Sequence, residues 1–255
     1  MKRMVSKKRL VALVGPSGSG KTAILEFLTL FYPDDFAVPR SATSRPRREG
    51  EGDSEFDFVS EDGFDALIKA GNLLEYSTYA GHRYGVTKAS VDEIIKQGRC
   101  ALRAMDFPGA KASGAYSVFV KRNTDKLLDA LLERNLPDTD TVRRLRQLKD
   151  EQANQDLCDA VVVNDAAIRD AAFQVYRAVT GKDGRVVPAT FAVIKPDGSI
   201  ARAPCHVDLA LDTVAFDDKR PEISDGDERL LIGGKMLNAR RTPFENGIDK
   251  IELPV

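Results

Sequence analysis

The chain has 255 residues, of which 42% are hydrophobic and 30% are charged, and its formal net charge is −1. These proportions suit a globular protein with one sizeable α/β core, with or without a small second module. The near-zero charge excludes a general attraction to nucleic acid or to a membrane surface, and no apolar run approaches the ~20 residues that span a bilayer.

The N-terminal nine residues are basic but lead directly into an apolar strand, so they do not resemble a signal peptide and we expect a cytoplasmic protein. The three cysteines, Cys100, Cys158 and Cys205, are far apart and odd in number. We therefore expect reduced thiols and no disulfide framework. The two histidines stand at no zinc-finger spacing, so we expect no structural metal.

The apolar run Leu10–Val14 is followed at once by the segment GPSGSGKT and then by an apolar helical pattern over residues 23–28. This segment has the G-x-x-x-x-G-K-[ST] pattern of a phosphate-binding loop in the strand-to-helix setting that the loop requires. Its glycines let backbone N–H groups turn toward phosphate oxygens, beside the positive end of the helix. Lys21 is expected to bridge the terminal phosphates and Thr22 to bind Mg²⁺. The predicted triphosphate site comprises Gly15, Pro16, Ser17, Gly18, Ser19, Gly20, Lys21 and Thr22.

A ligand-free glycine turn would have no use for the adjacent lysine and hydroxyl, so we favour the nucleotide site. Downstream, a Pro-Asp break precedes a short strand predicted over residues 36–39. Residues 40–55 then carry four arginines among hydroxyl groups. A charged stretch of this kind is usually a solvated loop. In a chain with a phosphate loop, guanidinium groups beside hydroxyls also suit a bidentate phosphate clamp, which we favour.

Several motifs, in order, resemble the guanylate kinase family over roughly the first 180 residues. They are the phosphate loop, SATSRPRREGE (41–51), FDFVS (56–60), GFDALIKAG (63–71), LEY (74–76), GHRYGVT (81–87), MDFPGA (105–110) and VVVND (161–165). The resemblance implies an α/β fold of three layers around a central parallel sheet, in a domain of residues 1–181. Within it, an acceptor-binding part is expected over about 40–104 and a lid over about 134–155.

The resemblance also implies an enzyme that uses ATP and Mg²⁺ to phosphorylate a nucleoside monophosphate, with GMP or dGMP as the favoured acceptor. Arg45, Arg48 and Tyr84 match positions that hold the acceptor phosphate, and Ser41 and Glu75 match positions that read guanine. A carboxylate suits this reading, because it accepts two parallel hydrogen bonds from the N1–H and the 2-amino group. The implied acceptor residues are Ser41, Arg45, Arg48, Glu75, Tyr84, Gly85, Val86 and Asp106. The implied catalytic residues are Lys21, Arg45, Asp106 and the lid arginines Arg134 and Arg144, and Asn164 is expected on the adenine side of the ATP site.

Four positions depart from the family's pattern on the acceptor side, and Ala130 stands where the family has a further lid arginine. Phe56 stands where a tyrosine usually donates to the acceptor phosphate, and Val86 stands where a hydroxyl usually meets the base. Thr87 follows Val86 and would replace it if the register shifted by one. Ala104 and Pro108 replace a carboxylate and a glutamine. Because unmatched polar groups decide base choice, these changes leave two alternatives open: another deoxy or modified nucleoside monophosphate, or a non-catalytic binding module. The Lys21–Thr22 pair favours the enzyme.

The rest of the chain gives predictions of structure. We expect a strand over 116–120, a helix over 125–134, a basic lid helix after residue 140, a strand over 160–163 and a helix over 168–180 that ends at Gly181. Residues 182–255 lie beyond the resemblance and predict a β-rich extension of unknown role, with a hairpin formed by 190–194 and 199–202 and a further strand over 206–211. The expected partners are ATP and a nucleoside monophosphate, without nucleic acid or membrane, and a homodimer is left open.

Overall fold

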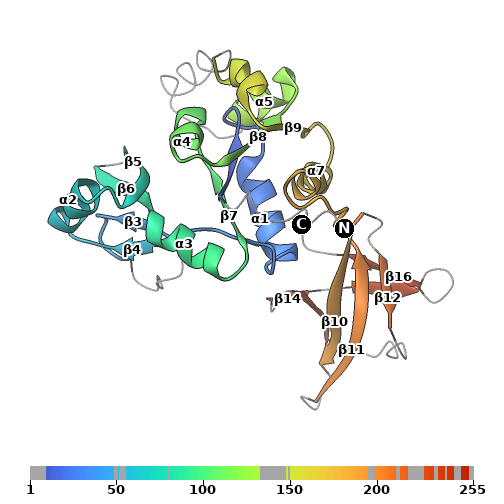
Figure 1. Ribbon diagram of the computed structural model, residues 1–255. Coiled ribbons are helices and arrows are strands. Elements are labelled where there is room, and N and C mark those ends of the chain that lie inside the picture. The colour runs from blue at the N-terminus through green and yellow to red at the C-terminus, as the bar shows by residue number, and fades with distance from the viewer. Residues whose placement is uncertain are drawn as a thin grey trace, which may run out of the picture. The chain divides into compact units, whose positions relative to one another are not determined.

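The computed structural model describes residues 10–48, 51, 56–79, 81–132, 148, 150–194, 199–210, 213–217, 227–232, 235–238, 240–243 and 248–252 (Figure 1). The chain divides into two compact units, Met1–Leu25 with Asp35–Asp165, and Glu26–Asp34 with Ala166–Val255. Within the described ranges, no helix is both long enough and apolar enough to cross a bilayer. The boundary after residue 181, expected from the sequence, stays a prediction.

A five-stranded parallel sheet forms the centre of the first unit, in the order β2-β7-β1-β8-β9. Its strands are β1 (Leu10–Val14), β2 (Phe36–Ala37), β7 (Cys100–Ala104), β8 (Tyr116–Lys121) and β9 (Ala160–Val163). Residues 11–14 of β1 are at most 2% exposed, and residues 118–120 of β8 are at most 1% exposed. Such continuous apolar runs are typical of strands that are covered on both faces.

The helices that connect these strands include α1 (Lys21–Phe31), α4 (Phe107–Ala112), α5 (Thr124–Leu132) and the 3₁₀-helix η1 (Asn154–Leu157). Because all five strands are parallel, their carboxyl ends lie at one edge of the sheet, which is where ligands bind in open α/β sheets. The predicted strands at 10–14, 116–120 and 160–163 are confirmed. The strand expected over 36–39 is confirmed only for Phe36–Ala37.

A smaller four-stranded sheet has the order β4-β3-β6-β5. Its strands are β3 (Ser41–Thr43), β4 (Phe56–Phe58), β5 (Leu73–Tyr79) and β6 (His82–Thr87), joined by α2 (Glu61–Lys69) and α3 (Lys88–Lys96). In Figure 1, α2 lies beside this sheet. Its fully buried Phe64 packs edge-on against Tyr76 of β5 at 6.3 Å, and the Arg83 guanidinium lies 4.7 Å from the Phe64 ring centroid. This face of the small sheet is therefore covered by α2.

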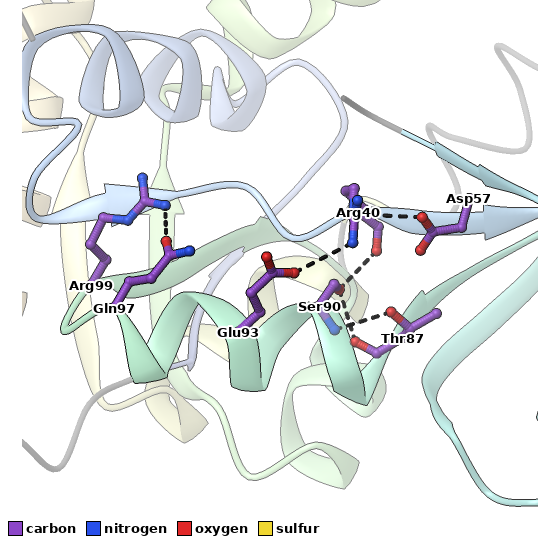
Figure 2. Close-up of polar contacts among 7 residues, drawn as sticks. All are labelled: Arg40, Asp57, Thr87, Ser90, Glu93, Gln97 and Arg99. Atoms are coloured by element: carbon purple, nitrogen blue, oxygen red, sulfur yellow. Dashed lines mark hydrogen bonds and ion pairs between the residues drawn. The ribbon is translucent and has the colours of Figure 1, made fainter. Parts of the chain in front are cut away.

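The first arginine of the basic segment, Arg40, binds elements of this sheet and of α3, as Figure 2 shows. Its Nε lies 3.6 Å from Oδ1 of Asp57, and its Nη2 lies 3.4 Å from Oε2 of Glu93. The Ser90 hydroxyl donates to the Arg40 carbonyl at 3.0 Å. Arg40 is therefore a structural member of the segment that was predicted to hold phosphate.

The second unit contains α7 (Ile168–Thr180) and a seven-stranded antiparallel sheet in the order β14-β13-β10-β11-β12-β16-β15. The strands are β10 (Val186–Ile194), β11 (Ile200–Asp208), β12 (Thr213–Phe216), β13 (Asp227–Ile232), β14 (Lys235–Asn238), β15 (Arg240–Pro243) and β16 (Ile248–Glu252). The predicted hairpin is confirmed, with Ile194 opposite Ile200. The strand predicted over 206–211 is confirmed only for residues 206–208, which form the end of β11 and continue its pairing with β10.

An aromatic cluster in this unit joins the end of α1 to α7. Tyr32 stacks on Tyr176 with ring centroids 4.3 Å apart, and its hydroxyl donates to the Gly184 carbonyl at 2.5 Å. Gly184 has a φ of +74°, and a Cβ there would lie 2.4 Å from the Tyr176 ring, so only glycine fits. The predicted end of α7 is confirmed, since Gly181 follows it in the left-handed conformation with a φ of 76°.

Candidate active site

The phosphate loop leaves the carboxyl end of β1 and enters α1, as its sequence predicts. It lies so close to β8 that a Cβ on Gly15, whose φ is +140°, would be 2.7 Å from the Val120 carbonyl oxygen. The Ser19 N–H donates to the Pro16 carbonyl at 3.1 Å and closes a turn. The loop is therefore shaped by its own backbone and by β8.

Lys21 is the first residue of α1, and its ammonium group is bound by the loop itself. It donates to the Gly15 carbonyl at 2.6 Å and to the Pro16 carbonyl at 2.8 Å. These two carbonyls accept from N–H groups of Lys21 that would otherwise donate to a phosphate. Thr22 follows with an exposed side chain at the start of the same helix.

Two side chains from the ends of neighbouring strands also hold the loop. Arg122, directly after β8, donates from Nη1 to the Gly18 carbonyl at 2.6 Å. Asn164, directly after β9, donates from Nδ2 to the Ser19 carbonyl at 2.8 Å and is only 3% exposed. The amide oxygen of Asn164 is buried and has no hydrogen-bond partner in the described part of the chain. The sequence interpretation missed Arg122, although its place after a strand that flanks the loop was readable.

The basic segment is organised by a carboxylate that the motif reading did not single out. Glu51 binds both Nη atoms of Arg45 at 2.9 Å and accepts the Arg48 N–H at 2.8 Å. These hydrogen bonds, the one from Arg45 first, lower the pKa of Glu51 to about 2. The same pair raises the pKa of Arg45, whose side chain is 9% exposed. Glu51 therefore holds the Arg45 guanidinium and the backbone of Arg48, the two arginines that were predicted to hold the acceptor phosphate.

Aromatic rings complete the surroundings of Arg45. Its guanidinium lies 5.5 Å from the Phe56 ring centroid and 5.4 Å from that of Phe58. The Phe56 ring in turn meets the ring of Tyr84 edge-on at 6.1 Å. Phe56, which lacks the hydroxyl expected at its position, therefore supports the guanidinium through its ring face.

The register of the small sheet puts the predicted base-reading positions in one row. Ser41 pairs with both Phe56 and Val86, and Val86 pairs with Glu75. Residues directly opposite one another point to the same face of a sheet, so Val86 stands between the two predicted base readers. The next row on this face contains Phe58, Thr43, Tyr84 and Ser77.

Thr87 does not replace Val86, because Val86 pairs with Ser41 and Glu75, whereas Thr87 pairs with Leu73 on the other side of an irregularity between Leu73 and Glu75. Its side chain points to the other face of the sheet and caps α3, where its hydroxyl oxygen accepts the Ser90 N–H at 3.2 Å (Figure 2). Val86 is 1% exposed and presents an apolar side chain in the row. The alternative in which Thr87 would supply the missing hydroxyl after a register shift of one residue is therefore not realised.

A pocket of about 560 Å³ opens beside this row. Its lining includes Glu75, Tyr84, Val86, Arg103, Asp106 and Gly109. Gly85 and Pro108 also line it, whereas Ser41, Arg45 and Arg48 do not. The predicted acceptor residues therefore divide into a pocket group, an arginine group organised by Glu51, and the buried Ser41, which belongs to the row but not to the pocket lining. Arg134 and Arg144 lie outside the described residues.

Charged groups meet at one end of this pocket. Burial raises the pKa of Glu75, with a further contribution from Asp106, while Arg103 opposes the rise from 4.0 Å. Asp106 accepts the Gly109 N–H at 2.7 Å and caps α4. A Cβ on Gly109 would lie 2.8 Å from a carboxylate oxygen of both Glu75 and Asp106. The two carboxylates therefore converge on the start of α4, and Arg103 is the cation beside them.

Comparison with known proteins is consistent with these features. The family model described as guanylate kinase matches residues 7–180. A guanylate kinase from Parasynechococcus marenigrum is 34% identical over 164 residues, which are 61% of this chain and 90% of that protein. A guanylate kinase from Synechococcus sp. strain CC9902 is 35% identical over 170 residues, 64% of this chain and 90% of that protein.

Among solved structures, the crystal structure of guanylate kinase from Anaplasma phagocytophilum aligns with a TM-score of 0.47 and 23% identity. The alignment covers 70% of this chain and 89% of that chain. The family match ends at residue 180, so β10 to β16 lie beyond it.

Proposed function

This chain belongs to the guanylate kinase family, and from that premise we propose that it transfers the γ-phosphoryl group of ATP to GMP or dGMP. The products are ADP and the corresponding diphosphate. The observation that carries the choice of acceptor is Glu75, a partly buried carboxylate that lines the pocket in one row with Ser41. A carboxylate accepts from the N1–H and the 2-amino group of guanine, which adenine does not offer as a pair.

The donor half of the site is the phosphate loop. Its backbone N–H groups and the start of α1 attract phosphate oxygens. Lys21 then exchanges the carbonyls of Gly15 and Pro16 for phosphate oxygens, a change of partners that leaves the loop in place. Arg122 and Asn164 hold the loop through the carbonyls of Gly18 and Ser19.

The residues at the start of α1 fit a magnesium ion that is bound with the nucleotide. Among the described residues, no group of three or more His, Cys, Asp or Glu side chains could hold a metal alone. Mg²⁺ in phosphoryl-transfer sites is typically held by substrate phosphates, waters and one or two protein oxygens, and the exposed Thr22 hydroxyl is such an oxygen. The ion supplies charge neutralisation on the transferring phosphoryl group.

Positioning and charge stabilisation carry the proposed reaction. Arg45 and Arg48, whose segment is arranged by Glu51, hold the acceptor phosphate, and Tyr84 binds beside them. The acceptor oxygen is then aligned with the γ-phosphorus, and the cations stabilise charge spread over the transferring group. We also propose that Arg134 and Arg144 close over the triphosphate, which would exclude water from the transfer.

A panel of nucleoside monophosphates with ATP and Mg²⁺ tests this function. GMP and dGMP are expected to give the highest kcat/KM among GMP, dGMP, AMP, CMP, UMP and IMP, measured by a coupled ADP assay. If another acceptor gave a higher kcat/KM, its base and not guanine would be the substrate base.

The loop variant Lys21→Ala tests whether this chain is the catalyst. We expect its kcat to fall by about 10²–10³-fold, as for removal of one preorganised charged donor. Circular dichroism would show that the fold is retained.

The unmodified chain also tests the alternative function. If it transfers phosphate to none of the monophosphates, a binding module would be supported instead. The same preparation, in analytical ultracentrifugation, would decide between a monomer and a homodimer, and a cytoplasmic location stays an expectation.

A further inference from the structure

Arg103 is a cation in the pocket for which the predicted acceptor site has no role. It lies on β7 opposite Ala12 of β1, and its neighbours Ala101 and Leu102 are fully buried. Its own side chain is 29% exposed and lines the pocket beside Glu75. A position in a central strand of a parallel sheet usually carries an apolar side chain, so this guanidinium needs an explanation.

The guanidinium is poorly satisfied by the protein. Within the part of the chain that the structure describes, its ion-pair partner is Glu75, with 4.0 Å between Nε and Oε1, and it donates no hydrogen bond. Burial lowers the pKa of Arg103, and the Glu75 charge only partly opposes this. An arginine has five N–H donors in a planar fork, which normally find acceptors when they leave bulk water. These donors border the pocket in which the acceptor base is proposed to bind.

Glu75 and Arg103 together make a pattern of acceptors next to a donor. The Watson–Crick edge of guanine offers the reverse pattern: the O6 acceptor, then the N1–H and the 2-amino group. If the Glu75 carboxylate binds the N1–H and the 2-amino group, then a cation next to this carboxylate lies beside O6. Val86, which stands between Ser41 and Glu75 in the row, brings no polar group to that edge.

We propose that Arg103 is a specificity-determining residue that donates a hydrogen bond to O6 of the guanine held by Glu75. This role rests on the proposed function, since it assigns one base contact in the proposed GMP site. It makes the pocket read three groups of the base with two side chains. It also explains how a site with Val86 at a hydroxyl position retains a choice of base.

The test compares acceptors that differ at one group. GMP, 6-thio-GMP and IMP are each assayed with ATP and Mg²⁺, using the full chain and Arg103→Leu. 6-Thio-GMP replaces O6 by sulfur, a weak acceptor, and IMP removes only the 2-amino group that Glu75 reads. For Arg103→Leu we expect kcat/KM for GMP to fall by about 10–100-fold, the worth of a charged hydrogen bond. Activity with 6-thio-GMP is expected to fall much less, so the preference for GMP over 6-thio-GMP largely disappears while the preference over IMP is kept.

Two further variants serve as controls for this experiment. Arg103→Lys keeps a cation with N–H donors but loses the planar fork of the guanidinium, and it is expected to retain part of the preference for O6 over sulfur. Arg99→Leu removes an arginine that lies outside the pocket, beside Gln97 (Figure 2), and should leave both preferences unchanged. Thermal melting of each variant identifies any that fails to fold.

Each outcome has one meaning. An equal loss with all three acceptors would show that Arg103 only positions Glu75 or supports the fold, and the proposal would be overturned. Unchanged kcat/KM for GMP in Arg103→Leu would overturn it too. Failure of the unmodified chain to phosphorylate GMP is a different result, because it would remove the proposed function itself.

Discussion

Two carboxylates of the proposed acceptor site, Glu75 and Glu51, have pKa values shifted in opposite directions by their surroundings. Burial and the nearby Asp106 charge raise the pKa of Glu75. Hydrogen bonds from Arg45 and Arg48 lower the pKa of Glu51 to about 2. Glu75 is thus costly to keep charged and suited to accept from a ligand, whereas Glu51 is already satisfied by the protein and serves as scaffold.

The raised pKa of Glu75 predicts a pH dependence of substrate choice. Because only the ionised carboxylate accepts two hydrogen bonds, kcat/KM for GMP should fall as the pH drops through this pKa, starting above the ordinary value of 4.5. Glu75→Gln should lose that dependence and lower kcat/KM for GMP by about 10–100-fold. The profile is measured from pH 8 to pH 5.

Stability gives an independent check on Glu75. Its pKa is higher in the folded chain than in the unfolded chain, so at neutral pH the charge opposes folding. Glu75→Gln is therefore expected to keep or raise Tm at pH 7 while it weakens GMP binding. A fall in both would contradict a role in reading the base.

The pKa shift of Glu51 has the opposite sign to that of Glu75, so its charge stabilises the folded chain. Its folded pKa of about 2 lies below the ordinary value of 4.5, so its contribution to stability is present above pH 4.5 and is lost between pH 4.5 and about 2. Glu51→Gln should raise KM for GMP by about tenfold, since Arg45 loses its bidentate partner. The difference in urea midpoint between the two proteins should shrink as the pH falls from 4.5 toward 3.

At the scale of elements, the row Phe56–Ser41–Val86–Glu75 crosses all four strands of the small sheet. The motifs indicated the candidate residues, but their side-by-side order depends on strand pairings between positions 11 to 45 residues apart in the chain. The same holds for Arg103, which only the folded sheet brings beside Glu75. Local patterns predict strands and helices well, because burial and capping leave a local signal in the sequence. They do not predict which residues become partners across a sheet.

Val86→Thr tests the row directly. The substitution keeps a β-branched side chain and exchanges a methyl group for a hydroxyl between Ser41 and Glu75. We expect kcat/KM for GMP to rise by about 3–10-fold, the worth of one neutral hydrogen bond. Tm should fall slightly, because the new hydroxyl is buried in the ligand-free protein. Unchanged kcat/KM would place the base elsewhere.

At the scale of the molecule, the family match and the compact units do not coincide. The match ends at residue 180, whereas α7 and the end of α1 group with the C-terminal sheet. A β-rich extension was predictable from alternating strands and turn residues, and the hairpin pairing was confirmed. The contact of Tyr32 with Gly184 was not, because nothing local links positions 152 residues apart.

Gly184→Ala tests how far this contact stabilises the chain. Both the left-handed backbone and the clash with Tyr176 oppose a side chain there. We expect the free energy of unfolding to fall by about 1–3 kcal/mol or more, measured by urea denaturation. Gly114→Ala is the matched control, since Gly114 has a φ of +65° and open space at its Cβ. Equal losses in the two variants would show that the packing against Tyr176 adds nothing.

The contacts of Lys21 with the Gly15 and Pro16 carbonyls have a consequence for how ATP is recruited. Since the ammonium already has two acceptors, ATP gains little from the number of its hydrogen bonds and much from the exchange of neutral dipoles for anionic oxygens. Such a gain is Coulombic and is screened by dissolved ions. ATP affinity should therefore weaken as ionic strength rises. The fraction of the loop that is occupied by ATP could then be changed with potassium chloride at constant temperature and pH.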